Sequence, residues 1–153
     1  MIGESTSTSE VTLVLTEGDR DRIVKHLRSA LPNEGVGLLA VEWIMREGEH
    51  IAESRQFYPG ANFRASPDRF ELDPRELIAA LRDVDLNGWS LGAIVHSHPL
   101  GAARPSQTDL DEAFYPESLM LIASFTNDPP DLQAWRLEQI GDEFVPVSVR
   151  ILV

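Results

Sequence analysis

The segment LGAIVHSHP, residues 91–99, decides the fold of this chain. Its apolar half contains two adjacent β-branched residues, which favour a strand, and Pro99 cannot continue a strand ladder. We therefore predict a buried strand over residues 91–98. Side chains two residues apart on a strand point to the same face, about 6.6 Å from each other along the chain. The strand thus presents His96 and His98 together at its end.

Strands and helices alternate on both sides of this strand. Apolar alternation and buried apolar runs predict further strands over residues 11–15, 35–43, 51–58, 119–125, 132–137 and 144–152. Helical spacing and capping residues predict helices from Thr16 to Pro32, from Asp73 to Asn87 and from Ser106 to Tyr115. The predicted fold class is α/β, in the broad sense that includes α+β, with a central mixed β-sheet flanked by helices.

Length and composition limit the class of protein. The 153 residues correspond to a single domain, which we place at residues 11–153 after a flexible N-terminus at residues 1–10. The net charge of −12 disfavours binding to nucleic acid or to an anionic membrane. Because the chain has no cysteine, disulfides and Cys-based zinc sites are excluded. No secretory signal or membrane span is recognisable, so a cytoplasmic location is expected.

A carboxylate follows the two histidines at a spacing that a loop can close. Asp109 comes eleven residues after His98, and the intervening loop can return it to the end of the strand. Two imidazoles and a carboxylate provide three ligands and leave a fourth tetrahedral position for water, as in catalytic zinc sites. Zinc lowers the pKa of such a water to about 7. We therefore predict one Zn²⁺ per chain, held by His96, His98 and Asp109.

Two further residues are candidates for the chemistry. Glu34 lies where the first helix gives way to a buried strand, and it can act as general acid/base towards the activated water. Ser106 can donate a hydrogen bond to the oxyanion of a tetrahedral intermediate. Ser106 and Asp109 also fit a helix capping box, so a purely structural interpretation stays open for them. The other two histidines, His26 and His50, are expected at the surface.

These residues together carry a family resemblance. Glu34, a His-x-His-Pro segment that starts at His96 and, after six residues, a Ser-x-x-Asp segment that starts at Ser106 resemble the full JAMM motif of the MPN+ metalloproteases. The resemblance spans roughly residues 11–137 and implies the MPN/JAB fold, which is cytidine-deaminase-like. The roles that it implies are zinc ligation by His96, His98 and Asp109, general acid/base catalysis by Glu34 and oxyanion stabilisation by Ser106.

The substrate class is also implied by the resemblance. The chain has no room for the long insertions of eukaryotic members and is similar to the compact bacterial group, which acts on ubiquitin-like or sulfur-carrier proteins. The expected reaction is hydrolysis of the amide after the carrier's C-terminal Gly-Gly. A non-catalytic MPN scaffold or binding module and a zinc hydrolase of a small-molecule amide stay open as alternatives. The oligomeric state, a homodimer included, also stays open.

A path for the carrier's tail can be predicted from small residues near the site. Gly35 and Gly37 leave little side-chain bulk on the strand that follows Glu34, and the loop over residues 100–105 contains further small residues. We expect an extended Gly-Gly tail to lie beside the strand over residues 91–98. There it would add main-chain hydrogen bonds to a sheet edge.

Overall fold

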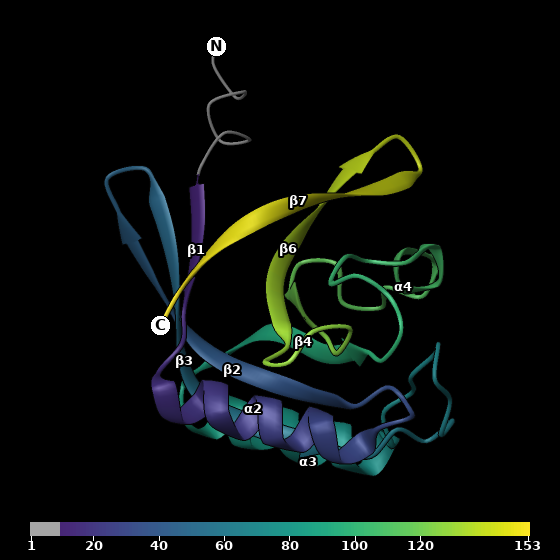
Figure 1. Cartoon of the computed structure of the whole chain (residues 1–153). Helices are drawn as coiled ribbons and strands as arrows, with labels where there is room; N and C mark the ends of the chain where they lie inside the picture. Colours follow the sequence, from purple (N-terminus) through teal and green to yellow (C-terminus); the bar gives the residue numbers. More distant parts are fainter. Residues whose placement is uncertain (1–9) are drawn as a thin grey trace.

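The computed structural model describes residues 10–153 (Figure 1). Its strands are β1 (Glu10–Val14), β2 (Val36–Arg46), β3 (Glu49–Gly60), β4 (Ser90–His98), β5 (Leu119–Ser124), β6 (Asp131–Ile140) and β7 (Glu143–Leu152). Its helices are α2 (Glu17–Ala30), α3 (Pro74–Leu86) and α4 (Gln107–Asp111). The predicted flexible segment 1–10 lies outside the described residues except for Glu10, which begins β1.

The strands form one mixed sheet that closes on itself in the order β1-β3-β2-β4-β5-β6-β7. β4 pairs antiparallel with β2 and parallel with β5, and β7 pairs parallel with β1 to complete the closure. The predicted fold class, with its mixed sheet and flanking helices, is confirmed. Closure is an addition to the prediction, and it removes the free edges that an open sheet of these strands would present.

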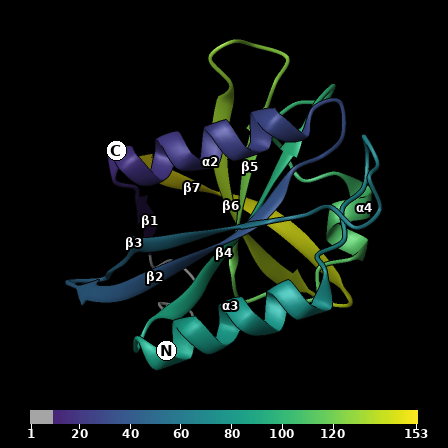
Figure 2. The ribbon, with the colours of Figure 1, turned by 90° about the horizontal axis from the view of Figure 1, so that it is seen from below.

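The two long helices cover opposite faces of the strands around β4. Helix α2 packs Ile23 and Leu27 into the main core, and α3 lies on the other face, where Leu77 shares a cavity wall with Ile94 of β4 (Figure 2). Alternation along β4 therefore directs Val95 to the α2 side, and Ile94 and His96 to the α3 side. None of the helices in residues 10–153 has the length and hydropathy of a membrane span.

Helix α4 is shorter than predicted. It ends at Asp111, whereas the sequence pattern predicted a helix that reaches Tyr115. Asp109 is its only buried residue, so no apolar stripe packs against the core to extend the helix. A capping box at its N-terminus, and not burial of apolar area, therefore defines this helix.

Candidate metal centre

The end of β4 places two imidazoles side by side in the protein interior. The exposed fraction is 0% for His96 and 7% for His98, and their ring centroids lie 5.1 Å apart. In the sheet His96 is opposite Val36 of β2 and Ile122 of β5, so both neighbouring strands fix its position. The prediction that the two histidines share one face at the end of a strand is confirmed.

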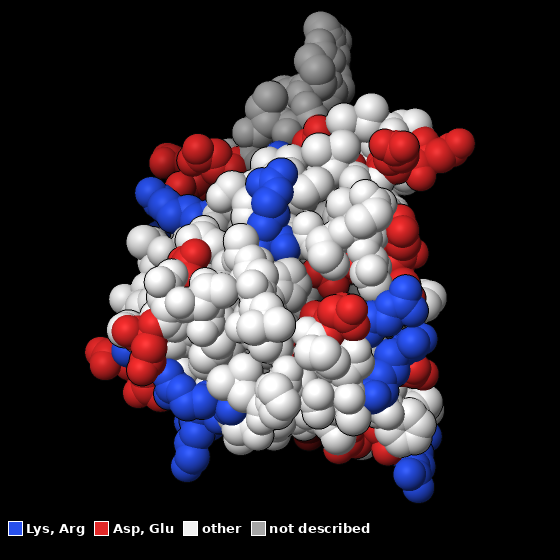
Figure 3. Space-filling model, turned by 45° about the vertical axis from the view of Figure 1, so that its right-hand side comes forward, with Lys and Arg blue, Asp and Glu red and all other residues white. Residues whose placement is uncertain are grey.

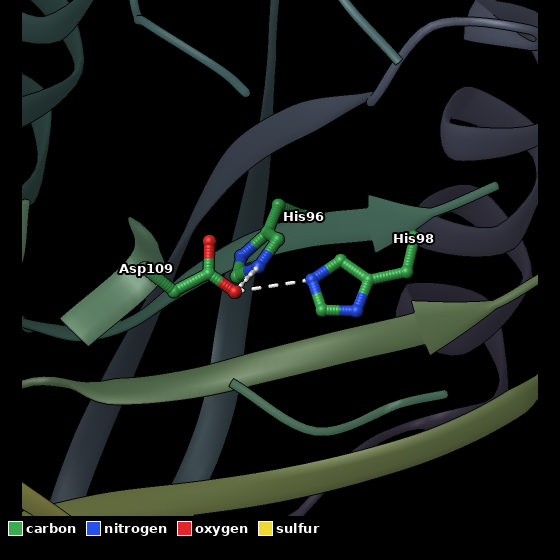
Figure 4. A group of neighbouring side chains, drawn as sticks. All are labelled: His96, His98 and Asp109. Atoms are coloured by element: carbon green, nitrogen blue, oxygen red, sulfur yellow. Dashed lines mark hydrogen bonds and ion pairs between the residues drawn. The ribbon is translucent and has the colours of Figure 1, made fainter. Parts of the chain in front are cut away.

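Asp109 comes to the same place from α4 (Figure 4). Its Oδ2 atom lies 3.1 Å from Nε2 of His96 and 3.0 Å from Nε2 of His98. The main-chain N–H of Ser106 donates a third contact to Oδ2, at 2.9 Å. One ligand atom from each of the three side chains lies within 4.8 Å of the others, so the group could hold a metal ion.

The hydrogen bond that His98 makes to a carbonyl oxygen shows that the group suits a cation. Its Nδ1 lies 2.7 Å from the carbonyl oxygen of Ala102, so Nδ1 carries the hydrogen and donates it. In the neutral ring the lone pair on Nε2 then faces an oxygen of Asp109. Two acceptors at this distance need a shared cation, either a proton or a metal. A carbonyl-anchored imidazole, a second imidazole and a carboxylate are a donor set that fits zinc.

Hydrogen bonds within the group shift the pKa values of Asp109 and His98 in opposite directions. Burial opposes ionisation of Asp109, but hydrogen bonds from His96 and His98 hold the pKa of its carboxyl well below the usual range. Burial likewise opposes the charged form of His98, yet its bonds to Asp109 and the Ala102 carbonyl raise its pKa. Asp109 is therefore an anion at neutral pH, as a metal ligand must be.

Glu34 is held next to this group by the residue between the histidines. Ser97 points to the opposite face of β4, where its Oγ accepts the N–H of Gly35 at 2.8 Å and its own N–H donates to the Gly35 carbonyl. Glu34 itself is 3% exposed, and its Oε1 has no hydrogen-bond partner among the described residues. Burial, reinforced by the negative charge of Asp109, raises the pKa of Glu34 to about 8. A buried carboxyl with this pKa is suited to proton transfer near neutral pH.

The raised pKa of Glu34 predicts a pH dependence of stability. The folded state binds the carboxyl proton of Glu34 more tightly than the unfolded state does. The stabilisation that this proton provides is therefore fully present below pH 4.5 and is lost as the pH rises to about 8. After removal of metal with a chelator, Glu34→Gln should therefore gain stability over wild type across this window. The gain should approach about 1.4 kcal/mol per pH unit. Chemical unfolding of both proteins at several pH values measures it, and parallel pH profiles would contradict it.

Ser106 forms the capping box that the sequence analysis gave as a structural interpretation. Its Oγ accepts the N–H of Asp109 at 3.0 Å, and its N–H donates to the carboxylate of the same residue. Ser106 is exposed, and the hydrogen on its Oγ is not used by the cap. The capping box is therefore present, and it leaves the hydroxyl hydrogen of Ser106 available for a substrate oxygen.

Ser106→Ala should lose both stability and turnover. Loss of the cap costs about 0.5–2 kcal/mol of the free energy of unfolding. Loss of an oxyanion donor lowers kcat on the order of 10²–10³-fold. Thr16→Ala is the matched control because Thr16 accepts the N–H of Asp19 at the N-terminus of α2, also at 3.0 Å. It should lose similar stability and keep its kcat, whereas equal losses of kcat in both variants would show that Ser106 only caps the helix.

His26 and His50 were expected at the surface; both are half-buried, and neither is in the group that could hold a metal. His26 is half-buried, and its Nε2 lies 3.0 Å and 2.9 Å from the carbonyl oxygens of Val36 and Gly60, so it links α2 to β2 and β3. His50 is a half-buried residue of β3. The turn before it is formed by Glu47 and Gly48, which both have positive φ.

The predicted path of the tail is also wrong. β4 is paired with β2 from Ser90 to His96 and with β5 from Ala93 to His98, so its stretch from Ala93 to His96 offers no edge to an added strand. A Cβ on Gly35 would meet Leu27 of α2, and a Cβ on Gly37 would meet the ring of Phe57. These glycines therefore allow the chain's own elements to pack closely and do not line a substrate channel.

A groove lies beside the metal group. It has a volume of about 310 Å³, and its lining includes His96 and Asp109. Most of its wall is apolar, with Leu72, Ile94 and Met120 among the lining residues. It is bounded by the segment between β3 and α3, for which the sequence analysis predicted no element.

Comparison with known proteins places this chain in a family. A family model described as prokaryotic homologs of the JAB domain matches residues 16–138. The desampylase of Haloferax volcanii is 32% identical over 145 residues, which cover 91% of this chain and 96% of that protein. The CysO-cysteine peptidase of Mycobacterium tuberculosis is 31% identical over 130 residues, which cover 83% and 84%. A probable TtuB-protein conjugate cleaving protease of Thermus thermophilus is 38% identical over 104 residues, which cover 67% and 64%.

Solved structures agree with this relationship. A protein of Desulfitobacterium hafniense, determined in solution, has a TM-score of 0.74 and 31% identity, with 91% of this chain and 92% of that chain covered. A protein of Salinibacter ruber has a TM-score of 0.61 and 29% identity, with 90% of each chain covered. The sequence matches and the shared fold lead to one conclusion: the chain belongs to the prokaryotic JAB family of JAMM-type peptidases.

Proposed function

We propose that this protein hydrolyses the amide bond after the C-terminal Gly-Gly of a ubiquitin-like or sulfur-carrier protein. The metal ligands in this proposal are His96, His98 and Asp109, and the metal is Zn²⁺. Glu34 is the general acid/base and Ser106 stabilises the oxyanion. One observation carries the proposal: two buried imidazoles and an ionised carboxylate converge beside a buried carboxyl whose pKa lies near neutrality.

The substrate class is carried over from the relatives. Their names describe a desampylase, a protease that cleaves TtuB-protein conjugates and a CysO-cysteine peptidase. The second and third names describe cleavage of a protein conjugate and a peptidase activity, which support hydrolysis of an amide bond by this chain. The high coverage of the desampylase and of the CysO-cysteine peptidase supports a comparable activity for the whole of this chain.

Each residue of the site has one task in this mechanism. When bound, Zn²⁺ supplies a water of lowered pKa and polarises the scissile carbonyl. Glu34 accepts the proton of the attacking water and passes it to the leaving amine, which its raised pKa permits. Ser106 donates its unused hydroxyl hydrogen to the developing oxyanion. Asp109 remains an anion and, with the hydrogen-bonded His98, fixes the geometry of the ligands.

Burial of the site favours a tail without side chains. The ligands lie at the bottom of the site, with His96 fully buried, so the substrate main chain has to approach them closely. Glycine permits this approach because it has no Cβ. The apolar groove beside His96 can then accept side chains farther from the scissile bond.

Recognition of the folded part of the carrier depends on local contacts. Figure 3 shows acidic and basic side chains interspersed around a broad uncharged area on one face. The net charge of −12 therefore does not produce a uniform acidic field on that face.

The experiment is cleavage of carrier proteins extended beyond Gly-Gly, with intact mass as the readout. Zinc-loaded protein should cut after the second glycine, and replacement of that glycine by valine should lower kcat/KM by about 10²-fold or more, or about 2.7 kcal/mol. Equal rates for Gly, Ala and Val, or cleavage of free small amides alone, would instead indicate a small-molecule amidase. Bound metal without any cleavage would indicate a binding module.

A further inference from the structure

The segment between β3 and α3, residues 61–73, contacts both the candidate base and a candidate metal ligand; we call it the 61–73 loop. The loop holds the main chain of Glu34 from both sides. The N–H of Glu34 donates to the carbonyl of Ser66 at 2.8 Å, and the carbonyl of Glu34 accepts the side-chain amide of Asn62 at 3.0 Å. Glu34 precedes β2, whose residues are held by sheet pairing. These two hydrogen bonds hold the main chain of Glu34 in the same way.

Asn62 also holds the loop together. Besides the bond to Glu34, its Nδ2 donates to the carbonyl of Arg69 at 2.8 Å, and the carbonyl of Ser66 lies farther away, at 3.4 Å. Its Oδ1 accepts the N–H groups of Arg64 and Glu71. Its main chain forms an isolated bridge with Leu72. A single side chain therefore fixes the shape of the loop and attaches it to Glu34.

Phe70, from the same loop, lies against a metal ligand. Its ring stacks on the imidazole of His96 with 4.7 Å between centroids and 27° between planes. Metal-ligating histidines usually donate their second ring nitrogen to an oxygen, as His98 does to Ala102. The Nδ1 atom of His96 is buried and has no hydrogen-bond partner among the described residues. On the Nδ1 side of His96, aromatic stacking therefore takes the place of such a hydrogen bond in orienting the ring.

We infer that the 61–73 loop positions the catalytic machinery, with Asn62 as the positioning residue for Glu34 and Phe70 as the positioning residue for His96. What the two positioned groups do rests on the proposed function. The inference itself concerns their placement, and it can be tested without any substrate.

Asn62→Ala tests the connection to Glu34. With excess zinc, kcat should fall about 10–100-fold while the zinc content stays at one per chain, because the base is displaced and the ligands are not. Without substrate, the amide of Glu34 should exchange its hydrogen faster. Asn87→Ala is the matched control, since it removes an amide that donates to a carbonyl at the C-terminus of α3. It should change neither quantity.

Phe70→Leu tests the contact with His96 and keeps an apolar side chain in the groove. Zinc affinity should fall about tenfold, and the visible spectrum of the cobalt-substituted protein should change because one ligand is less well oriented. Phe70→Tyr retains the aromatic ring, so it should restore both the affinity and the spectrum. A role in packing alone would lower the melting temperature of Phe70→Leu without changing the cobalt spectrum.

The outcomes separate this inference from the proposed function. If wild type cuts no carrier, hydrogen exchange at Glu34 and the cobalt spectrum still test the loop. Unchanged exchange in Asn62→Ala, or an unchanged spectrum and zinc affinity in Phe70→Leu, would overturn the inference even if cleavage is found. If Asn62→Ala does not fold, Asn62→Asp takes its place, because it keeps the acceptor towards Arg64 and Glu71 and loses the donor towards Glu34.

Discussion

Replacement of Glu34 by glutamine should remove nearly all turnover and leave the metal in place. Glutamine has the size of glutamate and can donate and accept hydrogen bonds, but it cannot take up a proton at neutral pH. Because Glu34 is the proposed base and not a ligand, zinc content should stay at one per chain. A positioned general base contributes about 10²–10⁴-fold, and we expect a loss of kcat near the upper end of this range.

The measurement is kcat on a conjugate substrate together with metal analysis of the same preparation. Glu42→Gln is the matched control because Glu42 is an exposed residue of β2 whose carboxylate pairs with Arg55. It should retain full turnover. Substantial activity in Glu34→Gln would mean that another group accepts the proton, and loss of zinc would place Glu34 among the ligands.

Replacement of Asp109 by alanine should remove the metal and, with it, activity. Oδ2 of Asp109 is the atom on which both imidazoles converge, and the variant retains only two of the three ligands. Loss of an outer hydrogen-bond partner of a metal site already costs about 10–100-fold in affinity, so loss of a ligand should cost more. We expect less than about a tenth of an equivalent of zinc after dialysis, with kcat below detection.

The neighbouring carboxylate provides a stringent control for this change. Asp111 lies in the same five-residue helix, is exposed and accepts a hydrogen bond from the Gln107 amide. Asp111→Ala should bind zinc and turn over like wild type. Zinc retained by both Asp109→Ala and His96→Ala would exclude the proposed ligand set. Circular dichroism should accompany each measurement, since Asp109 is also part of the cap of α4.

Sequence patterns predicted the structure well where local chemistry decides it. Strand β4 follows from adjacent β-branched residues and from Pro99, and its boundaries differ by one residue from those predicted. The N-caps Thr16 and Asp73 begin their helices as expected, since each side chain accepts a main-chain N–H of the first turn. The two histidines were predicted on one face because strand alternation is a local geometric rule.

Contacts between distant segments had no such local signal. The 61–73 loop has no apolar periodicity, and the sequence pattern predicted no element there. Its partners Glu34 and His96 lie on other strands, so nothing near Asn62 in the sequence identifies them. Ser97 was likewise overlooked, because the importance of its Oγ depends on the Gly35 N–H that reaches it from another strand.

By itself, the sequence determined the kind of chemistry and the elements that carry it. The types and spacing of Glu34, His96, His98, Ser106 and Asp109 are properties of the chain, and so is the alternation of strands and helices. Only the tertiary structure decided that the sheet closes, that β4 is paired on both sides from Ala93 to His96 and that an apolar groove lies beside His96. The physical reason is that propensity and periodicity act over a few residues, whereas pairing, burial and the raised pKa of Glu34 arise from segments that meet only in the folded chain.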